Sequence, residues 1–232
     1  MPSNWSKGYT KETHSSVRKI SDTMKKRKID NFAGWRNKMK AAGIIPSDYP
    51  EFVKNGDLAE LIGVILGDGH LSGFPRTEEL TIFSNANNAG FIKRYSGLLE
   101  QIFGKRPYIA KTSWSNCVRI RVYQKEIQKR LQIPFSPRGK KTIKIPRWIL
   151  NKKSYMIRYL RGLYEAEGSF CVHKPTATYK FLFSNKNSSM LNNVFRLMRR
   201  LGFHPHRDDS RVQLSRKEEV YQALKTLQFR QY

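Results

Sequence analysis

A nine-residue pattern that occurs twice is the feature that most constrains this sequence. The two copies are Leu61–Gly69, which reads LIGVILGDG, and Leu160–Gly168, which reads LRGLYEAEG. Each copy is an apolar stretch at helical spacing with small residues at its third and seventh positions, followed by an acid and a glycine. Small residues four apart line one face of a helix and let a second backbone come close. We therefore expect two packed helices with Asp68 and Glu167 side by side at their ends.

Two carboxylates held side by side have a limited set of electrostatic solutions. Such a pair repels itself unless one member is protonated or both share a cation. On a basic protein at neutral pH, a shared divalent metal is the expected solution. The duplication therefore predicts a metal site at the meeting point of two half-domains.

The overall charge indicates the kind of partner. The 232 residues contain 44 Lys and Arg against 18 Asp and Glu, a net charge of +26, which predicts a polyanionic partner. With 39% hydrophobic and 12% aromatic residues, the chain has enough apolar material for a packed core. The only cysteines, Cys117 and Cys171, show no metal-ligand spacing, and no apolar run has the length of a membrane span. We expect an intracellular protein that is neither secreted nor membrane-bound.

Three segments follow from the composition and the repeat. Residues 1–50 form a basic extension with the run Lys25, Lys26, Arg27 and Lys28, residues 51–150 hold the first repeat and a linker, and residues 151–232 hold the second repeat. Each repeat is predicted to run helix, two strands, helix, two strands, helix. In the first repeat, Asp57 is the expected N-cap of the opening helix, and further helices are expected over residues 89–103 and 125–131.

The predicted strands have one apolar and one polar face. In residues 117–123 the positions Val118, Ile120 and Val122 form an apolar row. The opposite row holds Arg119, Arg121 and Tyr123. In the second repeat the corresponding polar residues are Arg211 and Gln213, and Lys180 is a further candidate for DNA contact. A twisted antiparallel ribbon with such an outward face suits base edges and phosphates in the major groove. A solvated sheet face is the alternative interpretation.

At these residues the sequence resembles a known family. The two nonapeptides resemble the LAGLIDADG motif, and the duplicated order resembles the single-chain, two-repeat LAGLIDADG homing endonucleases, over residues 57–230. The resemblance implies an α+β fold of two pseudo-symmetric αββαββα repeats, with saddle-shaped antiparallel sheets packed through the two motif helices. It also implies a monomeric, intron-encoded enzyme that makes a double-strand break in a long asymmetric DNA site and leaves 3′ overhangs.

The resemblance also implies roles for individual residues. Asp68 and Glu167 match the metal-binding acids, which would hold Mg²⁺ or, in its place, Mn²⁺ or Ca²⁺. The carbonyls of Gly67 and Ala166 are further candidate ligands, since the last carbonyls of a helix lack intrahelical partners. The residues that order solvent at such sites match Asn85 and Asn185, and one lysine, which is Lys140 or Lys141. Turn formation by the asparagines and a solvated linker charge for the lysines are the alternatives.

Two alternatives to this interpretation remain, one for the function of the whole chain and one for the N-terminal extension. A nucleic-acid-binding protein of the same fold that does not cut, such as an intron maturase or a transcription regulator, would be free to lose either acid. The extension resembles the modular DNA-binding repeats appended to some homing endonucleases, and a disordered basic tail is the alternative interpretation of it.

The second repeat differs from the first after Leu227, where it shows no counterpart of Gly139-Lys140-Lys141. If the lysine assists cleavage, we expect the two DNA strands to be cut with unequal assistance.

Overall fold

A computed structural model describes residues 7–46 and 48–232. The chain divides into two units between Tyr49 and Pro50. The first unit contains α1 (Ser15–Lys26) and α2 (Ala33–Ala41), and neither helix has a buried residue. No helix in the described part of the chain is both long and apolar enough to cross a bilayer.

The second unit holds both repeats, and its first half follows the predicted order. Its elements are α3 (Gly56–Asp68), β1 (Gly69–Gly73), β2 (Glu78–Asn85), α4 (Ala89–Phe103), β3 (Tyr108–Lys111), β4 (Cys117–Gln124) and α5 (Ile127–Leu131). The four strands form one antiparallel sheet in the order β1-β2-β4-β3. Helix α4 ends where predicted, because Gly104 adopts the left-handed conformation (φ 61°) that closes a helix.

The second half repeats this arrangement. After the 3₁₀ helix η1 (Arg147–Asn151) come α6 (Lys153–Glu167), β5 (Gly168–His173), η2 (Lys174–Thr176), β6 (Thr178–Ser184), α7 (Ser188–Arg200), β7 (His206–Arg207), β8 (Arg211–Leu214) and α8 (Lys217–Leu227). The sheet order β5-β6-β8-β7 corresponds strand by strand to that of the first half. The predicted α+β fold of two αββαββα repeats is confirmed.

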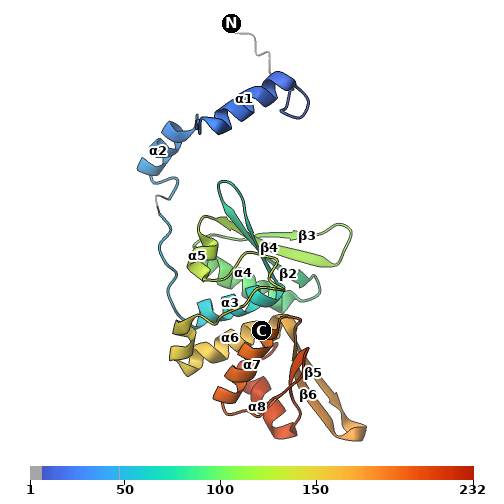
Figure 1. Cartoon of the computed structure of the whole chain (residues 1–232). Helices are drawn as coiled ribbons and strands as arrows, with labels where there is room; N and C mark the ends of the chain where they lie inside the picture. The colour runs from blue at the N-terminus through green and yellow to red at the C-terminus, as the bar shows by residue number, and fades with distance from the viewer. Residues whose placement is uncertain (1–6, 47) are drawn as a thin grey trace. The chain divides into compact units, whose positions relative to one another are not determined.

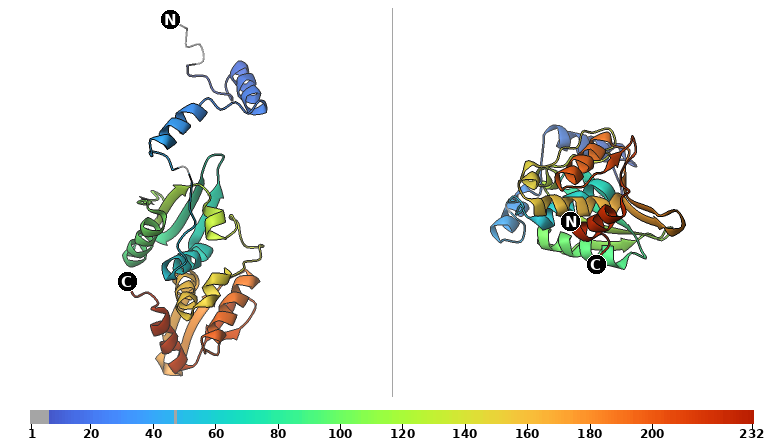
Figure 2. Two further views of the ribbon diagram at one scale, coloured as in Figure 1. Left: turned by 90° about the vertical axis from the view of Figure 1, so that its left-hand side faces the viewer. Right: turned by 90° about the horizontal axis from the view of Figure 1, so that it is seen from below.

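The two motif helices lie side by side in the middle of this unit, with one sheet on each side (Figures 1 and 2). A methyl group added at Gly63 would lie 2.3 Å from the Tyr159 carbonyl oxygen, and one at Gly162 would lie 2.1 Å from the Glu60 carbonyl oxygen. No side chain fits at those distances, so both positions require glycine. The predicted close approach of the two helices is confirmed.

The predicted alternation of the strands is also confirmed. Val118, Ile120 and Val122 of β4 are buried, as are Val212 and Leu214 of β8. Their neighbours along the strand point to the opposite face, because successive side chains of a strand alternate. Both sheets therefore place an apolar face on the core and a polar face outward.

Two predicted details of the first repeat were wrong. Helix α3 is capped by Asn55, whose side chain accepts a hydrogen bond from the Leu58 N–H at 2.9 Å, and Asp57 lies within the first turn. Asparagine and aspartate cap helices about equally well, so residue type alone does not choose between neighbouring positions. Helix α5 begins at Ile127, two residues later than expected, because Glu126 is left-handed (φ 57°).

Candidate active site and nucleic-acid face

The acids Asp68 and Glu167 are the last residues of α3 and α6. A Cβ added at Gly67 would lie 2.4 Å from the Ala166 Cβ and 3.1 Å from the Glu167 Cγ, so the two helix ends touch. Each acid is followed by a glycine at which the chain turns into a strand. A Cβ there would lie 2.5 Å from the Ile65 oxygen in the first copy and 2.3 Å from the Tyr164 oxygen in the second. The final glycine of the motif is thus required for the sharp turn after each acid.

The electrostatics of the acid pair are unfavourable. Burial, and then the negative charge of Glu167, raise the pKa of Asp68 from 3.8 to about 7. Burial also raises the pKa of Glu167. Within the described residues, no lysine, arginine or histidine forms an ion pair with either acid. Among the residues that the structure describes, the pair therefore has no cationic side chain to balance its charge.

This donor set fits a hard divalent cation. The described residues contain no group of three or more His, Cys, Asp or Glu side chains that could hold a metal. Mg²⁺ is usually bound by one or two carboxylates, with waters and substrate phosphates completing its octahedron. Two adjacent carboxylates without a counter-charge meet that requirement, and Gly67 and Ala166 place backbone carbonyls in the same two helix turns.

The two candidate asparagines have different surroundings. The Asn85 side-chain oxygen accepts hydrogen bonds from the Asn87 N–H at 2.9 Å and the Asn116 Nδ2 at 3.0 Å, so it builds a turn at the end of β2. The Asn185 oxygen builds the equivalent turn by accepting from the Asn187 N–H at 2.8 Å. In addition, Asn185 Nδ2 donates to Glu167 Oε1 at 3.3 Å. Only the second asparagine reaches an acid.

The candidate lysines lie on the exposed linker loop. Lys140 and Lys141 are both exposed, and the Lys141 Nζ donates to the Phe135 carbonyl at 2.7 Å. Asn187 holds this loop in place, because its Nδ2 donates to the carbonyls of Arg138, Gly139 and Lys141 at 3.0, 3.3 and 2.8 Å. Within the described residues, no contact joins Lys140 or Lys141 to Asp68 or Glu167, so a solvent-ordering role for these lysines stays a prediction.

Arg138 binds backbone carbonyls near the first acid, and this role was not predicted from the sequence. Its side chain is only 9% exposed, and its Nη2 donates to the carbonyl of Ile65 at 2.7 Å and to that of Gly69. Its Nη1 donates to Ser136 Oγ at 2.9 Å. The guanidinium therefore satisfies carbonyls on both sides of Asp68, and burial lowers its pKa. Nothing in the linker sequence distinguishes Arg138 from its basic neighbours.

The outward face of the first sheet carries the predicted row from β4. Strand pairing places Arg119 opposite Phe83, Arg121 opposite Thr81, and Tyr123 opposite Glu79. Neither Arg119 Nε nor Arg121 Nε has a hydrogen-bond partner within the described residues, and Arg121 Nε lies 3.8 Å from a Glu79 oxygen. Tyr123 is exposed. The face thus offers donors and an aromatic ring, with one arginine partly neutralised.

The second sheet carries the corresponding residues, and neighbouring polar side chains also bind two of them. Lys180, Arg211 and Gln213 share its outward face, since strand pairing places Arg211 opposite Ser184 and Gln213 opposite Leu182. Arg211 forms an exposed ion pair with Asp208 at 2.8 Å, and Gln213 Nε2 donates to Ser215 Oγ at 2.5 Å. These contacts are on the surface, where exposed pairs are weak and easily exchanged for a ligand.

The predicted basic run of the extension closes the first helix. Lys25 and Lys26 are the last residues of α1, Arg27 caps it, and Lys28 is left-handed (φ 52°). All four side chains are exposed. They are available to a polyanion, and cations at this end also complement the helix dipole.

Comparison with known proteins bears on the fold. No protein-family model and no curated protein sequence matches the chain. Among solved structures, mesophilic variants of the homing endonuclease I-DmoI are 19% identical, with a TM-score of 0.52 over 74% of this chain and 94% of theirs. I-DmoI in complex with DNA and Mn is also 19% identical, with a TM-score of 0.50 over 74% of this chain and 96% of that one. This protein has the LAGLIDADG fold.

A second group of similar structures is represented by full-length WhiA from Thermatoga maritima. It is 13% identical to this chain, with a TM-score of 0.53 over 78% of this chain and 57% of WhiA. The likeness in fold therefore extends to a protein of very low sequence identity. What the fold does in this chain must be argued from its own residues.

Proposed function

We propose that this protein is a homing endonuclease: a Mg²⁺-dependent enzyme that hydrolyses both strands of a long, asymmetric DNA site and leaves 3′ overhangs. The observation that carries the proposal is the pair of desolvated, uncompensated carboxylates where α3 and α6 meet. A fold maintained without cleavage gains nothing from two such acids, because each lowers stability until it is neutralised. The similar I-DmoI structures with DNA and Mn, or with DNA and Ca, support DNA and a divalent ion as partners.

Asp68 and Glu167, with the carbonyls of Gly67 and Ala166, would hold the ion. When bound, a divalent cation supplies an activated water and stabilises charge on the phosphate and the leaving 3′ oxygen. Asn185 keeps Glu167 oriented through its 3.3 Å hydrogen bond. Arg138 fixes the chain on both sides of Asp68 through the Ile65 and Gly69 carbonyls. Lys140 or Lys141 is proposed to order solvent from the linker loop.

The two outward sheet faces would bind the DNA. Arg119, Arg121 and Tyr123 of one sheet and Lys180, Arg211 and Gln213 of the other present donors suited to base edges and phosphates. Arg211 is already paired with the exposed Asp208 and can exchange that carboxylate for a phosphate, whereas Arg121 lies near the partly buried Glu79. Residues 1–50 would add contacts to the DNA backbone through Lys25, Lys26, Arg27 and Lys28.

The decisive experiment selects cleaved sequences from a randomised double-stranded DNA library in Mg²⁺. The wild-type chain should enrich one long site, and Asp68→Asn and Glu167→Gln should each lower double-strand cleavage of that site by about 10³-fold or more. This size is typical for the loss of one main electrostatic group at a reaction centre. Both variants should still bind the site, because they retain side-chain shape and both sheets. Wild-type-like cutting by either variant contradicts the two-acid site, and specific binding without any cutting by the wild type favours a non-cleaving regulator or maturase.

The extension has its own test. Deletion of residues 1–45 should leave the two repeats folded and the cut position unchanged, because both acids and both sheets lie downstream. Affinity should fall, and the log-log salt slope should weaken by about 0.9 for each lost phosphate contact. An unaltered slope across a salt series would show that this segment does not touch DNA.

A further inference from the structure

The segment Gln228–Tyr232, which follows α8, has a strained backbone. Gln228 and Arg230 adopt left-handed conformations, with φ of 49° and 52°. Residues with a side chain rarely adopt this region, and two instances within three positions need surrounding contacts to hold them. We call Gln228–Tyr232 the tail segment.

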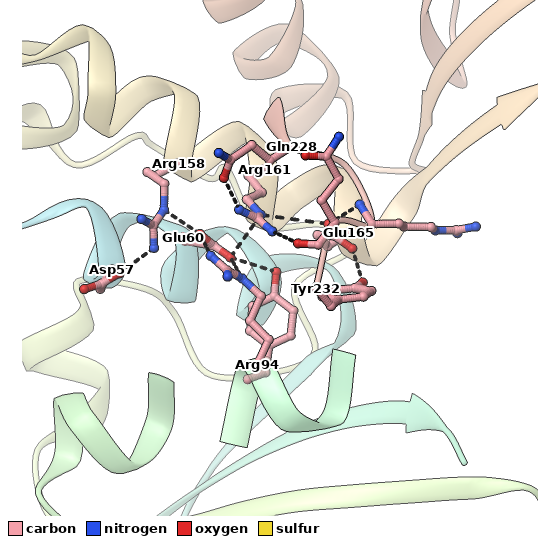
Figure 3. Close-up of polar contacts among 11 residues, drawn as sticks. Asp57, Glu60, Arg94, Arg158, Arg161, Glu165, Gln228 and Tyr232 are labelled. Atoms are coloured by element: carbon pink, nitrogen blue, oxygen red, sulfur yellow. Dashed lines mark hydrogen bonds and ion pairs between the residues drawn. The ribbon is translucent and has the colours of Figure 1, made fainter. Parts of the chain in front are cut away.

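Buried polar groups of α6 hold the tail segment in place (Figure 3). Arg161, which is 3% exposed, donates from Nη1 to Gln228 Oε1 at 2.6 Å and from Nη2 to the Gln231 carbonyl at 2.7 Å. Glu165 accepts hydrogen bonds from the Arg230 N–H at 2.6 Å and from the Tyr232 hydroxyl. The tail segment is therefore fixed along one side of the helix that carries Glu167.

Apolar contacts fix the two ends of the tail segment. Phe229 is buried in the second repeat, and its ring packs edge-on against that of Phe181, with 5.2 Å between the ring centroids. Tyr232 reaches the first repeat, where a Cβ added at Gly90 would lie 2.4 Å from the tyrosine ring. The tail segment thus spans from the core of one repeat to the α4 helix of the other.

The same polar cluster joins the two repeats through Glu60 of α3 (Figure 3). Glu60 is fully buried and accepts from Arg94 Nη2 of α4 at 2.8 Å and from Arg158 Nε of α6 at 2.5 Å. Arg161 Nε lies 3.5 Å from a Glu60 oxygen and 3.9 Å from a Glu165 oxygen. Arg161 therefore links the carboxylate of the first repeat, the carboxylate of the second and the tail segment.

Arg230 extends from the tail segment to the end of α6. Its Nη2 lies 3.5 Å from the carbonyl oxygen of Gly168, the residue after Glu167. In the first repeat, Arg138 donates to the carbonyl of Gly69, the residue after Asp68. Both arginines follow the last helix of their repeat, and both approach the same carbonyl beside an acid. Arg138 is buried and makes three contacts, whereas Arg230 is exposed and depends on the tail segment for its position.

We propose that the tail segment is a strap that positions the Glu167 half of the site, and that Arg230 is its positioning residue, as Arg138 is for the Asp68 half. This proposal rests on the proposed nuclease function. It predicts that the two halves are separable: loss of one arginine impairs the cutting of one DNA strand and loss of the other impairs the opposite strand.

The test is strand-resolved cleavage of the selected site in Mg²⁺. Arg230→Met should slow one strand at least tenfold more than the other and so accumulate nicked DNA, and Tyr232→Ala should show the same bias. Arg138→Met should slow the opposite strand. Arg230→Lys should recover part of the lost rate, and Arg196→Met, an exposed change on α7, should match wild type. Equal slowing of both strands by Arg230→Met, or a bias toward the strand affected by Arg138→Met, overturns the proposal.

A second measurement does not depend on cleavage. Amide hydrogen exchange at residues 168–170 should rise at least fivefold in Arg230→Met and Tyr232→Ala, with residues 69–71 unchanged. Arg138→Met should show the reverse pattern. If wild type cuts no DNA, the nuclease function fails while this exchange pattern still decides the strap. Unchanged exchange at residues 168–170 overturns the strap whether or not the protein cuts.

Discussion

The first repeat secures its acid with a buried arginine from the linker, whereas the second uses an exposed arginine and an asparagine. Arg138 makes contacts on both sides of Asp68, while Glu167 receives a hydrogen bond from Asn185 that Asn85 does not offer to Asp68. The helix packing around the two acids is nearly the same. The duplication therefore reproduces the scaffold that places the acids, and each half surrounds its acid with different side chains.

The largest expected effect tests the part that the repeats share. Gly63→Leu and Gly162→Leu should each lower the free energy of unfolding by roughly 3 kcal/mol or more, because a side chain there meets backbone atoms that cannot move aside. Urea unfolding measures this. Gly97→Ala on α4 is the matched control: nothing lies within 4 Å of its added Cβ, so better helix propensity should raise stability by about 0.5–1 kcal/mol. Wild-type stability of one interface variant would show that the two glycine faces are not equivalent.

A smaller effect is expected on the pH dependence of stability in metal-free buffer, which compares the two acids. The pKa of Asp68 is about 7 in the folded state and 3.8 ordinarily, so the folded state binds the proton more tightly than the unfolded state. Stability from this group is present below pH 4 and is lost as the pH rises toward 7. Asp68→Asn should therefore match wild type near pH 4 and be roughly 1–3 kcal/mol more stable at pH 8.

Glu167→Gln should show the same sign, since burial raises the pKa of Glu167 as well. Mg²⁺ should stabilise the wild type at pH 8 and stabilise Asp68→Asn much less, because binding to the folded state alone adds to its stability. Thermal unfolding across a pH series measures both effects. A stability difference that stays constant from pH 4 to pH 8 would contradict the burial of an uncompensated charge at Asp68.

The smallest effect separates the two asparagines. Asn185→Ala should slow cleavage about tenfold, equivalent to about 1.4 kcal/mol, because Glu167 loses an orienting hydrogen bond. Asn85→Ala should change the cleavage rate less than about twofold and cost about 1 kcal/mol of stability, as expected for loss of a turn hydrogen bond. Single-turnover rates and urea unfolding compare the pair. Equal rates for the two variants would mean that the contact with Glu167 has no part in the reaction.

The sequence predicted those features that depend on local periodicity. The small residues of the two motifs, the apolar rows of β4 and β8, and the glycine that ends α4 repeat at fixed spacings, and all are found as expected. Each reflects the geometry of a single helix or strand, so one stretch of sequence contains the whole signal.

The polar contacts around the site could not be predicted in this way. Glu60 is fully buried because Arg94 and Arg158, 34 and 98 positions away in sequence, neutralise its charge. Arg138 reaches Ile65 across 73 positions. Buried charges are tolerated only with their partners in place, and those partners come from elements that only the folded chain brings together.

The hydrogen bonds from Asn187 to the linker loop limit how the half-domains of such proteins can be exchanged to make chimeras. Here one amide from the second half binds three carbonyls of the connecting loop, and that loop carries Arg138 back to the first half. A chimera that keeps residues up to Thr142 but receives a foreign partner lacking this amide would lose the shape of the loop. A workable crossover point in this chain must therefore preserve Asn187 together with the segment that it binds.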